Sequence, residues 1–322
     1  MTIPKALTPT VPQHGGELDA AILRLKEKLS RAAGETEGSV RTGTLRIVRR
    51  TRRDTIHASV TEPVAALVVS GSKEARLFDT PVAYGQGAVF VCGVNVPDRF
   101  VLSGSRLEPF LALAVPISER TAERAIALLE AVREGADAEP ELRSPASERL
   151  PESLSGATAV LAADTELVEA FERLFDRERE CRDPVHDALC ELARMEVLVR
   201  ILKKTGAAAL RKLFHANTVE HRIRRSALWM REHYRESFDV ETVAQRFGMS
   251  PAAYHRRFRE VLSVSPRRYV ILLRLFEAKR LMSDEGFDAV RASAEVGYAS
   301  PSHFSRAYKA YFGSSPKADA RS

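Results

Sequence analysis

Cysteine is scarce in this sequence, with only Cys92, Cys181 and Cys190 among 322 residues. An odd number of cysteines without a Cys-x-x-Cys pair provides neither a disulfide framework nor a zinc site. Long apolar runs are also missing, since no stretch approaches the roughly 18 residues that a membrane span needs. The first residues lack the apolar segment of a signal peptide. These absences predict a protein of a reducing cytoplasm.

Groups that carry out catalysis are equally sparse. Between Arg41 and Pro116 the sequence has a single histidine, His57, and no His-x-His pair, whereas metal sites in barrels cluster His with Glu. A Gly-rich phosphate loop of the P-loop type is also lacking. We therefore expect no enzyme, no metal site and no cofactor, and we expect His57 on a strand surface or in a structural hydrogen bond.

Positive charge is present, and it is concentrated in one part of the chain. The net charge is +6, and residues 216–322 contain 19 Lys and Arg against 12 Asp and Glu, while the remainder contains 30 against 31. This asymmetry indicates a polyanion-binding module attached to a near-neutral one. The basic cluster His221–Arg225 is predicted as a solvated helix face, with phosphate contact as the alternative.

The first third of the chain changes its pattern at residue 41. Residues 1–40 hold a short amphipathic segment, Asp19–Leu29, between stretches rich in Pro, Gly, Thr and Glu. This composition predicts an N-terminal arm with a short helix. Residues 41–116 read as short apolar strands separated by turn residues, a pattern typical of a sandwich or barrel.

From residue 117 the apolar side chains recur with helical spacing. Residues 117–205 are therefore predicted to form helices after the barrel, two of them at Thr165–Glu180 and Pro184–Lys204. The second carries an apolar stripe of Leu189, Leu192, Met195, Val199 and Leu202. Residues 214–322 read as nearly all helix. The fold class is thus α+β, with an N-terminal β-barrel, following helices and a C-terminal all-α domain.

The all-helical part contains an internal repeat with an offset of 50 residues. Ser250 and Pro251 correspond to Ser300 and Pro301. The further matches are Tyr254 with Phe304, Arg256 with Arg306, Phe258 with Tyr308, Arg259 with Lys309, and Pro266 with Pro316. Serine at an N-cap followed by proline is a helix-start signal. Each unit therefore reads as helix, Gly-containing turn and capped helix, which is the form of a helix-turn-helix.

The capped helix of each unit has two distinct faces. At 100° per residue, the core stripes are Tyr254, Phe258 and Val261 in the first unit, and Phe304, Tyr308 and Tyr311 in the second. The opposite faces hold Ala252, His255, Arg256 and Arg259, and then Ser302, Ser305, Arg306 and Lys309. Long cations beside small or hydrogen-bonding residues suit a DNA major groove, where arginine can bridge guanine O6 and N7. A solvated helix face is the alternative, and the repetition of the layout argues against it.

Residues 214–322 resemble the DNA-binding domain of the AraC/XylS family of transcription regulators. The likeness is carried by VAQRFGMSPAAYHRRFRE, then SPRRYVILLRLFEAKRLM, then VGYASPSHFSRAYKAYFGSSP. It implies an all-helical domain in which a linking helix, here about Pro266–Met282, sets two recognition helices into successive major grooves. By position, the base-reading residues are Ala252, His255, Arg256, Ser302, Ser305 and Arg306. The phosphate anchors are Arg259, Arg267, Arg268 and Lys309. Ala252 is smaller than is common there, and Ser293 replaces a usual alanine.

Within residues 41–205, a stretch of about 75 residues resembles the N-terminal domain of one AraC branch, a cupin-like barrel followed by helices. GSKEARLF, AYGQGAVFV and the later Val-Pro carry this likeness. It implies a small-molecule effector inside the barrel and a homodimer, for which the helices of Thr165–Lys204 are our candidates. RNA polymerase is a further partner of such a regulator. Glu62, Tyr84 and Cys92 are candidate effector contacts, with turn or core roles as the alternative.

Three other functions remain open at this point. A DNA-binding regulator without a small-molecule ligand, controlled by abundance or a protein partner, would have a filled barrel. An enzyme with a DNA-binding tail would need a catalytic constellation. A nonspecific nucleoid protein needs only charge, whereas the two reading faces here differ in their side chains.

Overall fold

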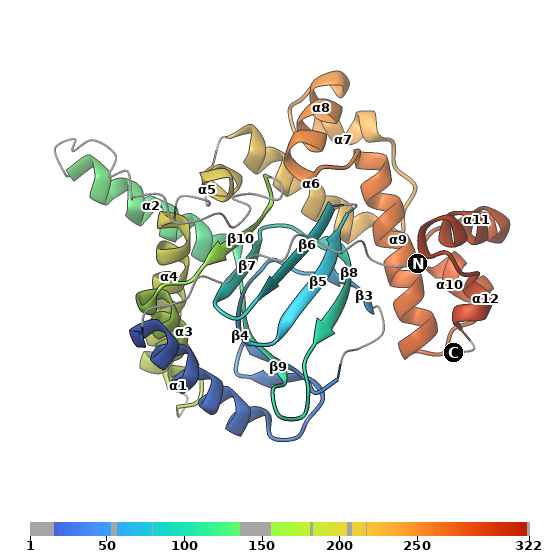
Figure 1. The fold of residues 1–322 in the computed structure, drawn as a ribbon. Helices are drawn as coiled ribbons and strands as arrows, with labels where there is room; N and C mark the ends of the chain where they lie inside the picture. Colours follow the sequence, from blue (N-terminus) through green and yellow to red (C-terminus); the bar gives the residue numbers. More distant parts are fainter. Residues whose placement is uncertain are drawn as a thin grey trace.

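The computed structural model describes residues 16–52, 57–78, 80–135, 156–180, 183–204, 208–216 and 218–320. The first residues of the predicted N-terminal arm and Cys181 lie outside these ranges. The described chain comprises a mostly β half, flanked by helices, and a helical half (Figure 1).

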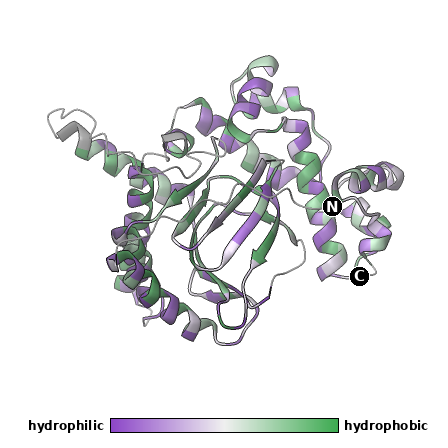
Figure 2. Cartoon of the chain, viewed as in Figure 1, coloured by the Kyte–Doolittle hydropathy of each residue, from purple (hydrophilic) through white to green (hydrophobic). Residues whose placement is uncertain are grey.

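The β half is built from short antiparallel strands. They are β1 (Gly38–Thr42), β2 (Leu45–Arg50), β3 (His57–Thr61), β4 (Val64–Ser70), β5 (Ser72–Leu77), β6 (Thr80–Gly85), β7 (Ala88–Cys92), β8 (Val96–Ser103), β9 (Phe110–Pro116) and β10 (Thr158–Ala162). Six of them form one sheet in the order β1-β2-β9-β4-β7-β10, and four form the other in the order β3-β8-β5-β6. The predicted sandwich or barrel is confirmed, with the strands mostly hydrophobic (Figure 2).

Strand β10 is an addition that the sequence pattern did not predict. It pairs with β7 from Thr158 opposite Cys92 to Ala162 opposite Ala88, although about forty residues and a helix separate it from β9. The segment TAVLA is too short and too isolated to be distinguished from a buried piece of helix by periodicity. The barrel therefore recruits a strand from the region that we assigned to helices.

Helix α1 (Gly16–Ala33) covers the outer face of the larger sheet. Its buried side chains, Leu18, Ala21, Ile22, Leu25 and Leu29, follow the spacing of one helical face. They meet the outward residues of β2, because strand side chains alternate between two faces. The predicted short amphipathic helix is confirmed, and it is a packed part of the barrel domain (Figure 1).

The helices after the barrel are α2 (Glu119–Gly135), α3 (Thr165–Arg177), α4 (Pro184–Lys203) and α5 (Ala208–Phe214). The predicted helices are present. Helix α4 buries His186, Cys190, Ala193, Val197, Leu198, Ile201 and Leu202. Of the apolar stripe, Leu202 is buried, Met195 and Val199 pack partly against the core, and Leu192 is 56% exposed. The stripe is therefore only partly covered.

The helical half consists of α6 (Val219–His233), α7 (Val240–Arg246), α8 (Pro251–Leu262), α9 (Pro266–Asp284), α10 (Ala289–Glu295), α11 (Pro301–Phe312) and α12 (Pro316–Asp319). Helix α9 runs through this half, with α7 and α8 at one end and α10 to α12 at the other (Figure 1). The predicted core stripes of both repeats are buried, at 8% exposure or less. This confirms two helix-turn-helix units joined by a long helix.

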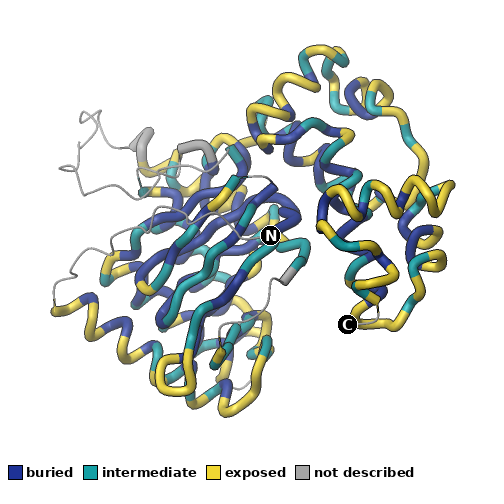
Figure 3. Tube along the Cα trace, turned by 45° about the vertical axis from the view of Figure 1, so that its right-hand side comes forward, coloured by how far each residue is buried: buried dark blue, intermediate teal, exposed yellow. Residues whose placement is uncertain are grey.

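The two halves are in direct contact. Helix α9 packs on β3 and β8, and the Tyr269 hydroxyl donates a hydrogen bond to the Asn95 carbonyl at 2.8 Å. From α6, Arg224 Nε donates to the Gly93 carbonyl at 3.0 Å. Buried residues continue across this contact (Figure 3). None of the helices in the described ranges combines the length and apolar character needed to cross a bilayer.

Candidate DNA interface and effector cavity

Both recognition helices begin in the same way. The Ser250 hydroxyl accepts a hydrogen bond from the Ala253 amide at the start of α8, and the Ser300 hydroxyl accepts one from the His303 amide at the start of α11. In each case proline follows as the first helical residue, as expected for a residue without an amide hydrogen. The repeat therefore fixes where both helices start, and with it which side chains share a face.

The predicted reading faces are open to solvent. Ala252, His255, Arg256, Ser302, Ser305 and Arg306 are all exposed, as are Arg259, Arg267 and Lys309. Arg268 differs, because it is half-buried and its guanidinium lies 5.3 Å from the centre of the Tyr311 ring. In α8, Arg257 is bonded to Glu260 at 2.8 Å, whereas Arg256 approaches that glutamate only to 3.9 Å.

Two histidines and a surface hollow lie between the helix-turn-helix units. His255 of α8 and His303 of α11 both line a hollow of about 560 Å³, together with Arg267 of α9. His303 was not among the predicted reading residues, although it follows Ser302 directly and is exposed. The hollow places polar groups of both units on one side of the domain.

Arg274, in the middle of α9, holds both units with one side chain. Its guanidinium donates to the carbonyls of Tyr234 and Glu236, which follow α6, and to that of Gly297, in the turn before α11. Burial lowers the pKa of Arg274 from its ordinary value, yet the group stays charged because arginine starts so high. The N–H groups of one planar guanidinium thus connect the turn of the second unit with the segment that follows α6.

A cavity of about 430 Å³ lies between the two sheets of the barrel. Strand alternation decides its lining: Leu45 and Ile47 of β2 are buried outside the cavity, while Arg46, Val48 and Arg50 line it. The same alternation brings every second residue of β4 and β9 to the cavity. The volume falls within the range of small-molecule sites.

The deep wall of the cavity carries an ion pair. Lys73 of β5 bonds Asp98 of β8 at 2.9 Å, and the other Asp98 oxygen accepts hydrogen bonds from the hydroxyls of Ser59 and Thr61. Burial disfavours the charge on Lys73, but the adjacent Asp98 carboxylate outweighs it and holds the pKa of Lys73 above its usual value. Lys73 also lies 4.2 Å from the centre of the Phe100 ring. The opposite charges of Lys73 and Asp98 therefore balance each other within the barrel wall.

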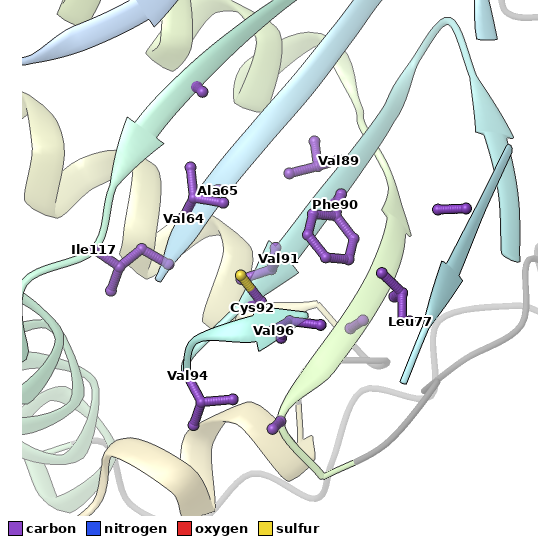
Figure 4. Packing of buried hydrophobic residues seen from close by; sticks show 14 of the residues in the cluster. Val64, Ala65, Leu77, Val89, Phe90, Val91, Cys92, Val94, Val96 and Ile117 are labelled. Carbon is purple, nitrogen blue, oxygen red and sulfur yellow. The ribbon is translucent and has the colours of Figure 1, made fainter. Parts of the chain in front are cut away.

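Of the predicted effector contacts, Glu62 and Tyr84 line the cavity. Tyr84 is stacked on Phe90 at 5.6 Å between ring centres, and burial raises its pKa to about 12. Cys92 is fully buried in β7, is absent from the lining, and donates its thiol to the Glu62 carbonyl at 3.2 Å. Figure 4 shows its sulfur among the side chains of Val64, Val91 and Val96. The alternative prediction, a small buried apolar residue, describes Cys92.

The basic cluster at the start of α6 forms a polar contact with α2 and is not a solvated helix face. Arg224 is 2% exposed, with its guanidinium 3.3 Å from Glu119 of α2 and 4.9 Å from the Phe214 ring. The prediction of a solvated face is therefore wrong for Arg224 and for the buried His221. Within the described ranges, Glu119, Glu123 and His221 bring potential metal ligands within 4.8 Å of one another. The ion pair between Arg224 and Glu119 joins α6 to α2 within this group.

Comparison with protein families agrees with both halves. Residues 42–209 match the model described as the N-terminus of AraC-type transcriptional regulators, and residues 243–322 match a helix-turn-helix domain. The first match alone covers more than half of the chain. The chain belongs to the AraC-type transcriptional regulators.

Individual AraC-type relatives share only part of the sequence. The chain is 29% identical over 127 residues to the transcriptional activator RhaS of Escherichia fergusonii, which is 39% of this chain and 44% of that protein. RhaS of an Enterobacter species is 26% identical over a stretch of the same length. The chain thus spans less than half the length of these relatives.

Solved structures show the same fold over most of the chain. ToxT from Vibrio cholerae has a TM-score of 0.54 at 12% identity, with 86% of this chain and 97% of that one covered. ToxT bound to (E)-4-(8-methylnaphthalen-1-yl)but-3-enoic acid gives the same TM-score and coverage at 11% identity. At such identity the likeness concerns the fold, which confirms the barrel, the following helices and the two helix-turn-helix units as one arrangement.

In this AraC-type chain, β8 connects the cavity with the DNA-binding half. Asp98 faces Lys73 on the cavity side, and its neighbour Arg99 points the other way, as alternation requires. Arg99 donates to the Tyr311 carbonyl at 3.4 Å and lies 5.9 Å from the Phe312 ring, both at the end of α11. On its other side in the strand, Arg99 is followed by Phe100, which lines the cavity, so adjacent residues of β8 contact the cavity and the second recognition helix.

Proposed function

We propose that this chain is a sequence-specific DNA-binding transcription regulator whose DNA affinity is modulated by a small molecule in the barrel. The observation that carries the proposal is the pair of capped helices at the two ends of α9. Each presents an exposed arginine beside small or hydrogen-bonding residues, Arg256 beside His255 and Arg306 beside Ser302. Such faces read base edges in the major groove, and two of them on one domain read two short blocks of sequence.

The barrel cavity favours modulation by an effector over the alternative of a regulator without a ligand. A regulator controlled only by abundance or by a protein partner would be expected to fill its barrel, whereas this one keeps about 430 Å³. A relative of the same fold, ToxT, has been solved with a small organic acid bound. The effector acts by binding the DNA-competent and the incompetent arrangements with unequal affinity.

Apolar side chains on the flanking helices support a homodimer. Leu128 and Val132 on α2, and Val185 and Leu192 on α4, are all about half exposed or more. Exposed apolar residues on neighbouring helices are typical of interaction surfaces. The name of the RhaS relatives, transcriptional activators, favours activation, with RNA polymerase as the partner at the promoter.

Selection from a random DNA library with the purified full-length protein at physiological salt tests this proposal. We expect enrichment of two short blocks about one helical turn apart, one for each recognition helix. Binding of all sequences alike, with steep salt dependence and no enrichment for either the full chain or residues 214–322, would instead mean a nonspecific DNA-binding protein.

A further inference from the structure

The hollow between the two helix-turn-helix units adjoins the predicted reading surface. His255, a predicted reading residue of α8, lines it, and so do Ser300 and His303 at the start of α11. Recognition helices that enter successive major grooves leave the intervening minor groove, with a phosphate backbone on either side, facing the protein between them. Under the proposed function, this stretch of DNA therefore lies over the hollow.

The permanent charges that line the hollow have the wrong sign for DNA. Three acids come from the segment after α6 and from α7, namely Glu236, Asp239 and Glu241, and all three are exposed. Two arginines come from α9, namely Arg267 and Arg274. Three negative charges against two positive charges leave a net charge of −1. A hollow with these charges alone would repel a phosphate backbone.

The two histidines decide the sign of this charge. His255 and His303 are both exposed, and histidine is the side chain whose charge ordinarily changes between pH 5 and 8. With both rings neutral the lining carries −1, and with both protonated it carries +1. Tyr298, the other titratable residue of the lining, stays neutral because burial raises its pKa above the ordinary value.

The charged neighbours of these histidines on their own helices do not titrate in the same range. Arg256, Arg259 and Glu260 share a second surface hollow with His255 on α8, and Arg306 follows His303 by three positions on α11. Arginine and glutamate ordinarily keep their charges between pH 6 and 8. A change in DNA affinity over this range that depends on His255 and His303 therefore reports the charge of the hollow.

We propose that the hollow binds the DNA backbone between the two sequence blocks and that protonation of His255 and His303 accompanies this binding. A protonated imidazole donates charge-assisted hydrogen bonds to phosphate oxygens, whereas neutral rings leave the hollow negative. The DNA-bound protein then holds more protons than the free protein, so the affinity rises as the pH falls from 8 to 6 and is lost as the pH rises. This inference rests on the proposed function and adds its regulation by pH.

Fluorescence anisotropy with the full-length protein and the selected DNA duplex, at pH 6 and pH 8 and constant salt, tests the proposal. We expect about tenfold tighter binding at pH 6, with roughly threefold from each histidine. In His255→Gln and in His303→Gln the gain should shrink to about threefold, and in the double variant it should disappear. A purely base-reading or structural role would weaken binding alike at both pH values. An unchanged gain in both single variants, or no gain in the unmodified protein, would refute the proposal.

Two further variants separate the hollow from the other titrating groups. His215 is exposed, pairs with Glu130 at 2.8 Å and does not line the hollow. His215→Gln should therefore keep the full gain, and a loss equal to that of the other two variants would also refute the proposal. Glu241→Gln removes one acid of the lining and should tighten binding about threefold at pH 8. Unchanged binding at pH 8 would contradict the role of the charge of the hollow.

The failure of this inference can be distinguished from the failure of the proposed function. An enriched two-block sequence whose binding does not depend on pH would uphold the DNA-binding regulator and refute only the protonation of the hollow. Conversely, a duplex of random sequence can replace the selected one if the library yields no enrichment. A gain at pH 6 that both histidine variants reduce would then establish the hollow as a site for the DNA backbone in a nonspecific DNA-binding protein.

Discussion

Arg256 and Arg306 occupy equivalent positions of the repeat, and both side chains are exposed on recognition helices. If each bridges a guanine, alanine at either position removes a bidentate contact and costs about 1–3 kcal/mol of discrimination. The quantity to measure is the ratio of dissociation constants for the selected site and for a site changed at one base, at fixed salt. Each variant should lose discrimination in its own block only.

Arg257→Ala is the matched control for this prediction. Arg257 lies on the same helix, carries the same charge and is bonded to Glu260 at 2.8 Å, but it is not on the predicted reading face. Its removal should weaken both sites equally, because a phosphate or long-range contact carries no sequence information. Our placement of α8 would be wrong if Arg256→Ala behaved in the same way.

The buried thiol of Cys92 leads to a prediction about its reactivity and about the pH dependence of stability. Burial raises the pKa of the Cys92 thiol to about 12, so near pH 8 only about one molecule in ten thousand carries the reactive thiolate. Alkylation by iodoacetamide, followed by mass spectrometry, should leave Cys92 unmodified in the folded protein and modify it in urea. Since the unfolded thiol ionises at its ordinary pKa, this group lowers the free energy of unfolding as pH rises from about 9 towards 12. Rapid native alkylation would contradict the buried placement.

At the scale of elements, the turns of the two helix-turn-helix units make different demands on their glycines. Gly248 and Gly297 both have positive φ, at +67° and +87°. A Cβ on Gly297 would lie 2.2 Å from the Arg235 carbonyl oxygen, whereas on Gly248 the nearest atom is the end of the Arg222 side chain at 3.5 Å. The turn at Gly297 therefore packs tightly against the Arg235 backbone, whereas the turn at Gly248 has room for a small side chain.

Alanine substitutions at Gly248 and Gly297 should distinguish the cost of backbone strain from the cost of a steric clash. Gly248→Ala should cost about 1 kcal/mol, the penalty of a left-handed conformation. Gly297→Ala should cost at least about 2 kcal/mol more, because backbone atoms must move. Urea unfolding of both variants measures the difference, and equal midpoints would show that the second turn is looser than its geometry indicates.

The elements that the sequence predicted best are those whose signals are local. Ser250 and Ser300 cap their helices, and Tyr254 and Phe304 are buried, because caps and helical faces depend on residues three or four positions apart. Helix α4 has apolar side chains on more than one side, and which of them are buried depends on where α2 and α3 lie, which no window of sequence contains.

The cavity was out of reach of sequence reasoning for a similar reason. Lys73 and Asp98 are 25 residues apart on neighbouring strands, where the register pairs Lys73 with Leu102 and Asp98 with Leu77, so they meet only because the long Lys73 side chain passes over Phe100. Glu62 and Tyr84 were chosen correctly as lining residues, while Arg41 and Arg46 were missed. The alternation of β2 could have shown that Arg46 and Arg50 share a face, but not that this face is the inner one.

For the whole molecule, the position of the barrel restricts how an effector can act. The barrel contacts α6, α9 and the end of α11, yet both reading faces remain exposed (Figure 3). An effector therefore has nothing to uncover. Under the proposed function it would instead change how the second recognition helix is held relative to the first. Arg99 is one contact between the barrel and that helix, and the Phe78 carbonyl, which accepts from the Tyr311 hydroxyl at 3.5 Å, is another.

Arg99→Ala should raise the affinity of the ligand-free protein for its selected site. If the observed contacts belong to the DNA-incompetent arrangement, losing one hydrogen bond of about 1 kcal/mol shifts the population by about fivefold. Arg31→Ala, which removes an exposed charge of α1 far from α11, is the control for net charge. Fluorescence anisotropy on labelled DNA measures both, and a drop in affinity for Arg99→Ala alone would place this contact in the competent arrangement.

Helix α9 also limits how this regulator can change over generations. Its 19 residues span roughly 28 Å, close to the repeat of the major groove, and Arg274 ties its middle to both units. If Arg256 and Arg306 read bases as proposed, substitutions there retarget the protein one base at a time. Inserting or deleting a single residue in α9 would instead turn one unit about 100° relative to the other, so a lineage can inherit new target sequences far more readily than a new spacing between them.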